Sequence, residues 1–245
     1  MTETKKQIMG HDNAKAANAR QKRGGVRVKR LLDLYCGGGG AGYGYEQAGF
    51  YVVGVDLFPQ PRHRGGFIQG DAIKYLLKNY GKFDAVHASP PCQAYSSASK
   101  QFRAAGKKYC DLVAKTRDAL ISTGLPYVIE NVPGSPLIDP ITLCGQSFGM
   151  RTYRHRLFES NIPLTAPPHI PHTTPNAKMG RPAINGEFIQ YVGHFPGVKQ
   201  VQEMTGLHWL GQKELAQSIP PQYTRYLGEQ ILAFINSDTP PQTPR

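Results

Sequence analysis

The chain has 245 residues, of which 40% are hydrophobic and 19% charged, and its formal net charge is +12. This length and composition suit one domain with a sizeable core and exclude a mainly disordered chain. No apolar run approaches the length of a membrane span, and the four cysteines follow no disulfide-framework pattern. We therefore expect a soluble protein without membrane contact, in the reducing cytoplasm. The oligomeric state is open, with a monomer favoured.

Basic residues are concentrated at the start of the chain. Residues 1–30 contain nine Lys or Arg and two acids, a net +7 that leaves +5 of the total +12 for the other residues. We expect residues 1–29 to form a flexible basic arm, which could follow the phosphate backbone of a nucleic acid without reading its sequence. A solubilising tail is the alternative. A second flexible tail, rich in Pro and Thr, is expected at 237–245.

The first predicted strand, near 31–35, runs directly into a glycine-rich loop. Three glycines of this loop fit the GxGxxG pattern: Gly37, Gly39 and Gly42. Asp56 follows the first of them by 19 residues and ends the second predicted strand, near 51–55. Glycines let the backbone approach a nucleoside cofactor, and an acid at this spacing can bind the ribose hydroxyls. The loop alone does not distinguish NAD, FAD and S-adenosylmethionine sites, and it could be only a tight turn.

Two helices are predicted between the strands, near 71–78 and 110–123. The second ends at Gly124, with Pro126 just beyond, which is a typical helix stop. Asp71 begins the first of them. Its carboxylate could contact the amino group of an adenine ring, or it could cap the helix N-terminus.

The third and fourth predicted strands, near 84–88 and 127–130, each end in a chemically active side chain. Pro90-Pro91-Cys92-Gln93 follows the third strand, and Glu130-Asn131-Val132 ends the fourth. Ligands of open α/β sheets gather at the carboxyl ends of the strands, so a nucleophilic thiol and a carboxylate can face one substrate there. The alternatives are that Cys92 is a small buried hydrophobe and Glu130 an ordinary surface acid.

The segment after the cysteine, Tyr95–Cys110, has the composition of a mobile lid. Its Ser, Ala and Gly residues permit movement, and Tyr95 or Phe102 could fill a gap in a base stack. Four basic residues could contact phosphates: Lys100, Arg103, Lys107 and Lys108. A plain solvated loop is the alternative.

A fifth strand near 155–159 carries a pair of arginines, Arg154 and Arg156. Prolines then punctuate an insertion without helical periodicity, and three short helices follow. The alternation of strands and helices predicts an α/β fold with a mostly parallel, Rossmann-like sheet and helices on both faces. The predicted parts are a catalytic and cofactor-binding domain at 30–160, a small Pro-rich insertion at 161–197, and C-terminal helices at 198–206, 212–217 and 223–236.

Three histidines of the insertion suggest a zinc site: His169, His172 and His194. No pair of cysteines has metal-ligand spacing, however. We therefore expect no metal site, and we interpret these histidines as loop or substrate-facing residues.

Five of these motifs, in this order, resemble those of the C5-cytosine DNA methyltransferase family. The matching segments are Asp33–Gly40, Pro91–Gln93, Glu130–Val132, Arg154–Arg156 and Gln217–Pro221. Three positions depart from the family pattern: Tyr35 replaces Phe, Thr152 replaces Gln, and Gln217 replaces Asn. The resemblance covers roughly residues 30–235, and the compact form is similar to phage-encoded members.

The resemblance implies a Rossmann-like, S-adenosylmethionine-dependent methyltransferase acting on cytosine in double-stranded DNA. The Cys92 thiolate, with a pKa lowered by the site, would add to C6 of the base and make C5 nucleophilic. Glu130 would act as an acid at N3, and the guanidinium of Arg154 or Arg156 would hold the O2 carbonyl.

The remaining contacts follow from the resemblance together with the residue patterns described above, including the basic residues of the segment after Cys92. The cofactor-binding residues would be Tyr35, Gly37, Gly39, Asp56, Leu57, Asp71, Gln217 and Ser218. The substrate-binding residues would be Pro91, Gln93, Asn131, Arg103, Lys107 and Lys108.

The insertion is too short for a rich base-reading surface in the major groove. Sequence preference is therefore expected to be short or loose, or the substrate is not duplex DNA. The alternatives are C5 methylation of cytosine in RNA or in a free nucleotide, and an inactive nucleic-acid-binding protein on the same scaffold.

Overall fold

The computed structural model describes residues 22–23, 26–178 and 180–237. The predicted basic arm and the Pro/Thr-rich tail therefore lie almost entirely outside the described residues. Two short strands, β1 (Lys22–Arg23) and β2 (Val26–Arg27), pair antiparallel ahead of the main sheet. No helix in the described part of the chain has the length and apolar character needed to cross a bilayer.

The core of the molecule is a seven-stranded sheet in the order β5-β4-β3-β6-β7-β9-β8. Five parallel strands form most of it: β3 (Arg30–Leu34), β4 (Tyr51–Asp56), β5 (Gly66–Gln69), β6 (Ala85–Ala88) and β7 (Tyr127–Asn131). Two strands complete one edge in antiparallel register: β9 (Arg156–Ser160) against β7, and β8 (Ile141–Leu143) against β9. The predicted α/β, mostly parallel sheet is confirmed, while β5 and β8 were not predicted.

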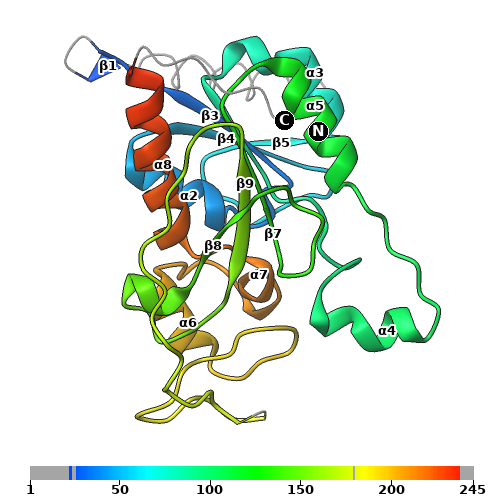
Figure 1. Ribbon diagram of the computed structural model, residues 1–245, viewed down its shortest axis with the longest axis vertical. Helices are drawn as coiled ribbons and strands as arrows, with labels where there is room; N and C mark the ends of the chain where they lie inside the picture. Colours follow the sequence, from blue (N-terminus) through cyan, green and yellow to red (C-terminus); the bar gives the residue numbers. More distant parts are fainter. Residues whose placement is uncertain (1–21, 24–25, 179, 238–245) are drawn as a thin grey trace, which may run out of the picture.

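Helices cover both faces of this sheet, as Figure 1 shows. On one face lie α2 (Gly40–Ala48) and α8 (Pro221–Asn236), whose Tyr45 and Leu227 pack against Leu31 of β3. On the other lie α3 (Ala72–Asn79) and α5 (Val113–Thr123), packed against Leu32 and neighbouring apolar strand residues. Leu31 and Leu32 of β3 point to opposite faces of the sheet, because side chains alternate across a strand, and each joins the hydrophobic core on its own face. Each fully buried leucine contributes about 1.5–3 kcal/mol through apolar burial.

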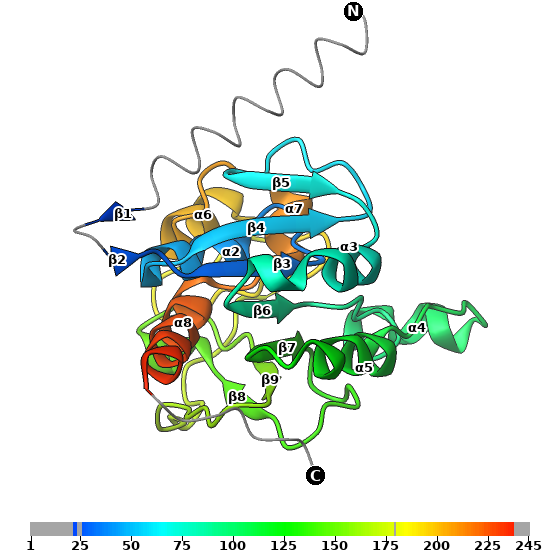
Figure 2. The same cartoon turned by 90° about the horizontal axis from the view of Figure 1, so that it is seen from above.

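The segment after β6 leaves the body of the domain. It forms η2 (Ser97–Ser99) and the short helix α4 (Lys100–Ala104). Figure 2 shows α4 beyond the arrowheads of the parallel strands, well outside the sheet. This is the edge at which ligands of such sheets bind.

The Pro-rich insertion lies near α6 (Val198–Thr205) and α7 (Gln212–Gln217). Among its described residues, the only regular backbone pairing is an isolated β-bridge between Asn176 and Phe188. Three of its buried side chains, Ile189, Tyr191 and Phe195, share a small apolar core with these helices. The insertion is therefore fixed to the C-terminal helices by hydrophobic packing.

Candidate active site

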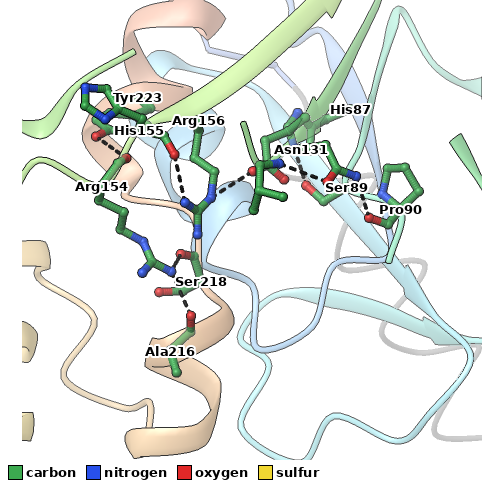
Figure 3. Close-up of polar contacts among 12 residues, drawn as sticks. His87, Ser89, Pro90, Asn131, Arg154, His155, Arg156, Ala216, Ser218 and Tyr223 are labelled. Carbon is green, nitrogen blue, oxygen red and sulfur yellow. Dashed lines mark hydrogen bonds and ion pairs between the residues drawn. The ribbon is translucent and has the colours of Figure 1, made fainter. Parts of the chain in front are cut away.

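Cys92 lies in the loop that follows β6, at the carboxyl edge of the sheet. The buried strand β6 ends at Ala88, and the chain passes through Pro90 and Pro91 to a half-buried thiol. Asn131, at the end of β7, donates from Nδ2 to the Pro90 carbonyl at 3.0 Å. This bond is drawn in Figure 3, and it ties the cysteine loop to the neighbouring strand.

Glu130 of β7 faces the same region and is paired with an arginine. The Arg156 Nε lies 3.1 Å from Glu130 Oε1, and the two side chains are 14% and 6% exposed. Burial raises the pKa of Glu130, while the nearby Arg156 cation and a hydrogen bond from Ser89 oppose the rise. A raised pKa makes this carboxyl a better proton donor near neutral pH.

The Cys92 thiol does not have the lowered pKa that the sequence predicts. Burial, and next the negative charge of Glu130, raise the pKa of Cys92, and the Arg156 and Arg154 cations only partly offset this. Protonation of Glu130 would remove the opposing charge and leave the cations. The protonation state of Glu130 therefore influences how readily the Cys92 thiol ionises.

The two arginines have different partners, as Figure 3 shows. Arg154 is buried and donates to the carbonyls of Tyr191, Ala216 and Ser218 at 2.8–2.9 Å. Its guanidinium also lies 3.9 Å from the centre of the Tyr191 ring, and burial lowers its pKa to about 10. Arg154 thus joins the insertion to the end of α7, and only Arg156 contacts Glu130.

The glycine loop connects β3 to α2 through residues with positive φ. Gly37 and Gly39 have φ of 50° and 83°, in the left-handed region that favours glycine. The Gly37 amide donates to Asp56 Oδ2, and the Phe58 amide donates to Asp56 Oδ1, both at 3.0 Å. The Asp56 carboxylate therefore shapes the loop as well as the adjoining turn.

Beside this loop, Leu57 and Phe58 are 60% and 67% exposed. Large apolar side chains exposed at the carboxyl edge of a sheet suit a flat ring of a ligand. Tyr35, with φ of 59°, shares a hydrogen bond between its hydroxyl and Thr116 Oγ1 at 2.9 Å. The Asp71 carboxylate accepts from the Lys74 amide at 2.9 Å and caps α3, the alternative role that the sequence left open.

The C-terminal segment returns to the glycine loop, as its sequence motif indicated. A side chain at Gly40 would start 3.0 Å from Ser218 Cβ, so this segment packs directly against the loop. The Trp209 indole also donates to the Gly38 carbonyl at 3.3 Å. Ser218 is buried, whereas Gln217 is exposed.

The basic residues after Cys92 differ in what they contact. Arg103 donates to the carbonyls of Gln93 and Ser96 at 2.9 and 2.7 Å, and to that of Tyr95 at 3.4 Å. Lys107 is exposed and lies over the rings of Phe102 and Tyr109, and Lys108 is also exposed. Arg103 therefore supports the cysteine loop from within, while the two lysines face outward.

Sequence reasoning missed a polar chain behind Glu130. The Tyr45 hydroxyl and His87 Nδ1 are 2.9 Å apart, as are His87 Nε2 and Ser89 Oγ. Burial lowers the pKa of His87 to about 3, so its ring is neutral. Ser89 in turn bonds to Glu130. The one available signal was a histidine inside the apolar strand Ala85–Ala88.

The histidines of the insertion also depart from the prediction. His169 and His172 gather with His155 and Cys144, two residues from the β8–β9 region, whereas His194 is not part of this group. The expectation of no metal site rested on the absence of a cysteine pair with metal-ligand spacing, and it did not anticipate a cluster of one cysteine and three histidines.

Comparison with curated proteins finds relatives among type II methyltransferases. No family model matches the chain. The type II methyltransferase M.HgiGI of Herpetosiphon aurantiacus is 30% identical over 90 residues, covering 32% of this chain and 71% of that protein. The type II methyltransferases M.FnuDI of Fusobacterium nucleatum and M.HgiDI of H. aurantiacus are 30% and 31% identical, over 28% and 32% of this chain. The chain spans only 22% and 29% of their length.

Solved structures give the same fold. The S. pombe Dnmt2 methyltransferase aligns with a TM-score of 0.55 and 14% identity, over 85% of this chain and 100% of that one. The Entamoeba histolytica methyltransferase EhMeth aligns with a TM-score of 0.55 and 13% identity, over 86% of this chain and 100% of that one. At this identity the likeness concerns the fold, and it confirms the Rossmann-like methyltransferase sheet.

Proposed function

The chain belongs to the type II methyltransferases, a family of DNA methyltransferases, and we propose that it methylates C5 of cytosine in double-stranded DNA, with S-adenosylmethionine as the methyl donor. The supporting observation is the meeting of Cys92, Glu130 and Arg156 at the carboxyl edge of one sheet. A thiol, a buried acid of raised pKa and a guanidinium are the groups that activate a pyrimidine ring for attack from C5.

In this proposal Cys92 begins the reaction. Its thiolate forms a bond to C6 of the cytosine, the C5–C6 double bond is lost, and N3 takes the proton of Glu130. The ring becomes an enamine whose C5 is nucleophilic. S-adenosylmethionine, when bound, supplies the electrophilic methyl group that this carbon takes up. S-adenosylhomocysteine is left after the transfer. Loss of the C5 proton, by default to water, then restores the C5–C6 double bond and expels the Cys92 thiolate, and N3 returns its proton to the Glu130 carboxylate.

The charges around Glu130 suit this sequence of events. While Glu130 is protonated, it does not oppose formation of the Cys92 thiolate, and Arg156 favours it. After its proton has passed to N3, Glu130 is a carboxylate that is stabilised by the ion pair with Arg156. The same guanidinium has further donors for the O2 carbonyl of the base. Arg154, with its donors directed at three carbonyls, is assigned a positioning role.

The residues around the glycine loop fit a nucleoside cofactor. Gly37 leaves open space where a side chain would lie, and the Asp56 carboxylate stands beside it for ribose hydroxyls. Leu57 would contact the adenine ring from the exposed edge. Four further residues are proposed around the same ligand: Tyr35, Gly39, Asp71 and Ser218. Gln217 is proposed at its periphery.

Access to a base within a duplex requires that the base be extruded, because a stacked cytosine cannot present C6 to a thiol. Extrusion costs a few kcal/mol. We assign the lid role to Tyr95–Cys110, with Lys107 and Lys108 on phosphates. Arg103 would instead hold the lid to the cysteine loop through the Gln93 carbonyl. Pro91 and Asn131 would set the path of that loop beside the base.

The test is transfer of labelled methyl groups from S-adenosylmethionine to duplex DNA, RNA and dCMP in parallel. Incorporation into DNA, followed by sequencing that locates 5-methylcytosine, is expected. Label found only in RNA or in dCMP would show that the substrate is not duplex DNA, while the proposed C5 chemistry would stand. No label in any of the three, from protein that binds S-adenosylmethionine, would indicate an inactive binding protein.

A further inference from the structure

A cluster of one cysteine and three histidines lies at the junction between the insertion and the sheet. Cys144 follows β8, His155 precedes β9, and His169 and His172 belong to the insertion. One ligand atom from each residue lies within 4.8 Å of the other three. Cys144 Sγ is 3.4 Å from His172 Nε2, and His155 Nε2 is 3.0 Å from His169 Nε2.

These separations are close to those of a tetrahedral zinc site. With Zn–S of about 2.3 Å and Zn–N of about 2.0–2.1 Å, the edges of the tetrahedron are roughly 3.3 Å between nitrogens and 3.6 Å between sulfur and nitrogen. The longest separation, at most 4.8 Å, must shorten by up to about 1.2–1.5 Å to reach these edge lengths. Exposed histidine side chains can make such an adjustment, and His169 and His172 are both exposed.

The surrounding contacts hold the ligand residues in place. The ring of Tyr153 stacks on His172 with centroids 3.7 Å apart, and its hydroxyl donates to the Thr174 carbonyl at 2.6 Å. The Ser147 hydroxyl donates to the Pro168 carbonyl at 2.9 Å, just before His169. The chain is thus anchored on both sides of the His-x-x-His segment.

The sulfur lies on the buried side of the cluster. Cys144 is 1% exposed, and its Sγ is 3.4 Å from His172 Nε2. A buried thiol that faces three imidazoles is a donor set preferred by Zn²⁺.

We propose that Cys144, His155, His169 and His172 bind one Zn²⁺ ion as a closed, structural site. Four protein ligands leave no position for a substrate, which is characteristic of structural rather than catalytic zinc. The ion would fasten the insertion to the β8–β9 region. It would also fix His155, whose carbonyl accepts from Arg156 Nη1 at 2.8 Å, as Figure 3 shows. The binding of zinc does not depend on the proposed methyl transfer.

The first test is the metal content of the full chain, purified without chelator, loaded with ZnSO₄ and dialysed to remove loosely bound ions. We expect about one Zn²⁺ per chain. The double variant His169→Ala/His172→Ala should retain less than about a tenth of this amount, since half of the ligands are gone. The matched control is His194→Ala, which removes an exposed histidine of the same insertion from outside the cluster and should retain the wild-type amount.

The second test identifies the ligands by spectroscopy. Co²⁺ in place of Zn²⁺ should give the intense visible bands of a tetrahedral site together with a sulfur-to-cobalt charge-transfer band in the near ultraviolet. Cys144→Ala should lose the charge-transfer band. Chelation should lower the melting temperature of the wild type and leave that of the double variant unchanged. A wild type without bound metal, or a double variant that binds as much as His194→Ala, would overturn the proposal.

Discussion

Arg156 and Glu130 form a nearly buried ion pair across β7 and β9, while Arg154, two residues earlier, makes no contact with Glu130 and donates to backbone carbonyls. Two arginines of one motif, separated by a single residue, therefore have different direct partners. One acts on the charge of the proposed acid, and the other holds the C-terminal segment in place.

The first prediction concerns these arginines. Arg156→Ala should lower the rate of methyl transfer by about 10²–10³-fold, because a charged donor in the site is lost. Arg154→Ala should instead lower the free energy of unfolding by about 1–3 kcal/mol, because three buried carbonyls lose their donors. Turnover assays and thermal denaturation on both variants separate the two effects. Wild-type turnover in Arg156→Ala, or wild-type stability in Arg154→Ala, would contradict the division of roles.

The second prediction concerns the nucleophile. Cys92→Ser should abolish methyl transfer and leave binding of S-adenosylmethionine within twofold of wild type, because the thiol acts on the base. Duplex DNA containing 5-fluorocytosine should trap the wild type covalently, since fluorine cannot leave C5 as a proton does. Cys110→Ser, at the exposed cysteine that ends the lid segment, is the control: it removes a second thiol but keeps Cys92, and it should still be trapped. Methyl transfer by Cys92→Ser would show that Cys92 is not the nucleophile.

The third prediction concerns the cofactor. Asp56→Ala should weaken binding of S-adenosylmethionine by about 1–3 kcal/mol, because the ribose loses its partner and the Gly37 amide is left unpaired. Calorimetry measures this. Asp71→Asn provides a comparison, since asparagine also caps helices, so any loss of affinity there reports on the ligand rather than on α3. Binding of NAD in place of S-adenosylmethionine would contradict the proposed function.

Much of this architecture follows from local sequence. The strands near 31–35, 51–55, 84–88 and 127–130 were predicted within a few residues, because buried parallel strands are nearly continuous apolar runs that end in turn residues. The strand β5 was missed because its Gly66–Gln69 sequence is short and partly exposed. The placement of Cys92 beside Glu130 followed from the rule that parallel strands end at one edge.

The parts that depend on long-range contacts were not predictable. Nothing in Arg154-His155-Arg156 reveals which guanidinium turns toward Glu130, because the difference depends on carbonyls more than 35 residues away. The pKa of Cys92 likewise depends on burial and on the charge of a residue in another strand. Cys144 and His155 reach the insertion only through the antiparallel edge of β8 and β9.

The fourth prediction concerns the lid. Lys107→Ala/Lys108→Ala should weaken DNA binding and reduce the slope of log K against log salt by up to about 2, since each lost phosphate contact lowers it by about 0.9. Arg103→Ala should lower methyl transfer with less change in slope, because its donors hold the carbonyls of the cysteine loop. Lys78→Ala/Lys82→Ala, at exposed lysines ahead of β6, is the charge-matched control. If the control and the lid variant had the same slope, the phosphate contacts would lie elsewhere.

The fifth prediction follows from Asp33, which is fully buried in β3 behind the glycine loop. Burial raises its pKa from 3.8 to about 8, and the charges of Asp56, Glu46 and Glu130 add to the rise. Between these two pH values the unfolded chain has released the proton that the folded chain keeps. The contribution of Asp33 to folding stability is therefore greatest below its unfolded pKa and falls as pH rises toward 8, by up to about 1.4 kcal/mol per pH unit.

Asp33→Asn removes this titration and keeps the shape of the side chain. We expect the variant to gain stability relative to wild type as pH rises, with a higher melting temperature at about pH 8 than the wild type and a smaller difference at about pH 5. Asp139→Asn, at an exposed aspartate with a left-handed backbone that asparagine tolerates, is the matched control and should follow the wild type. Thermal denaturation of the three proteins across this range measures the effect. A pH dependence that is the same in all three proteins would contradict the prediction, because it would mean that Asp33 is ionised in the folded chain.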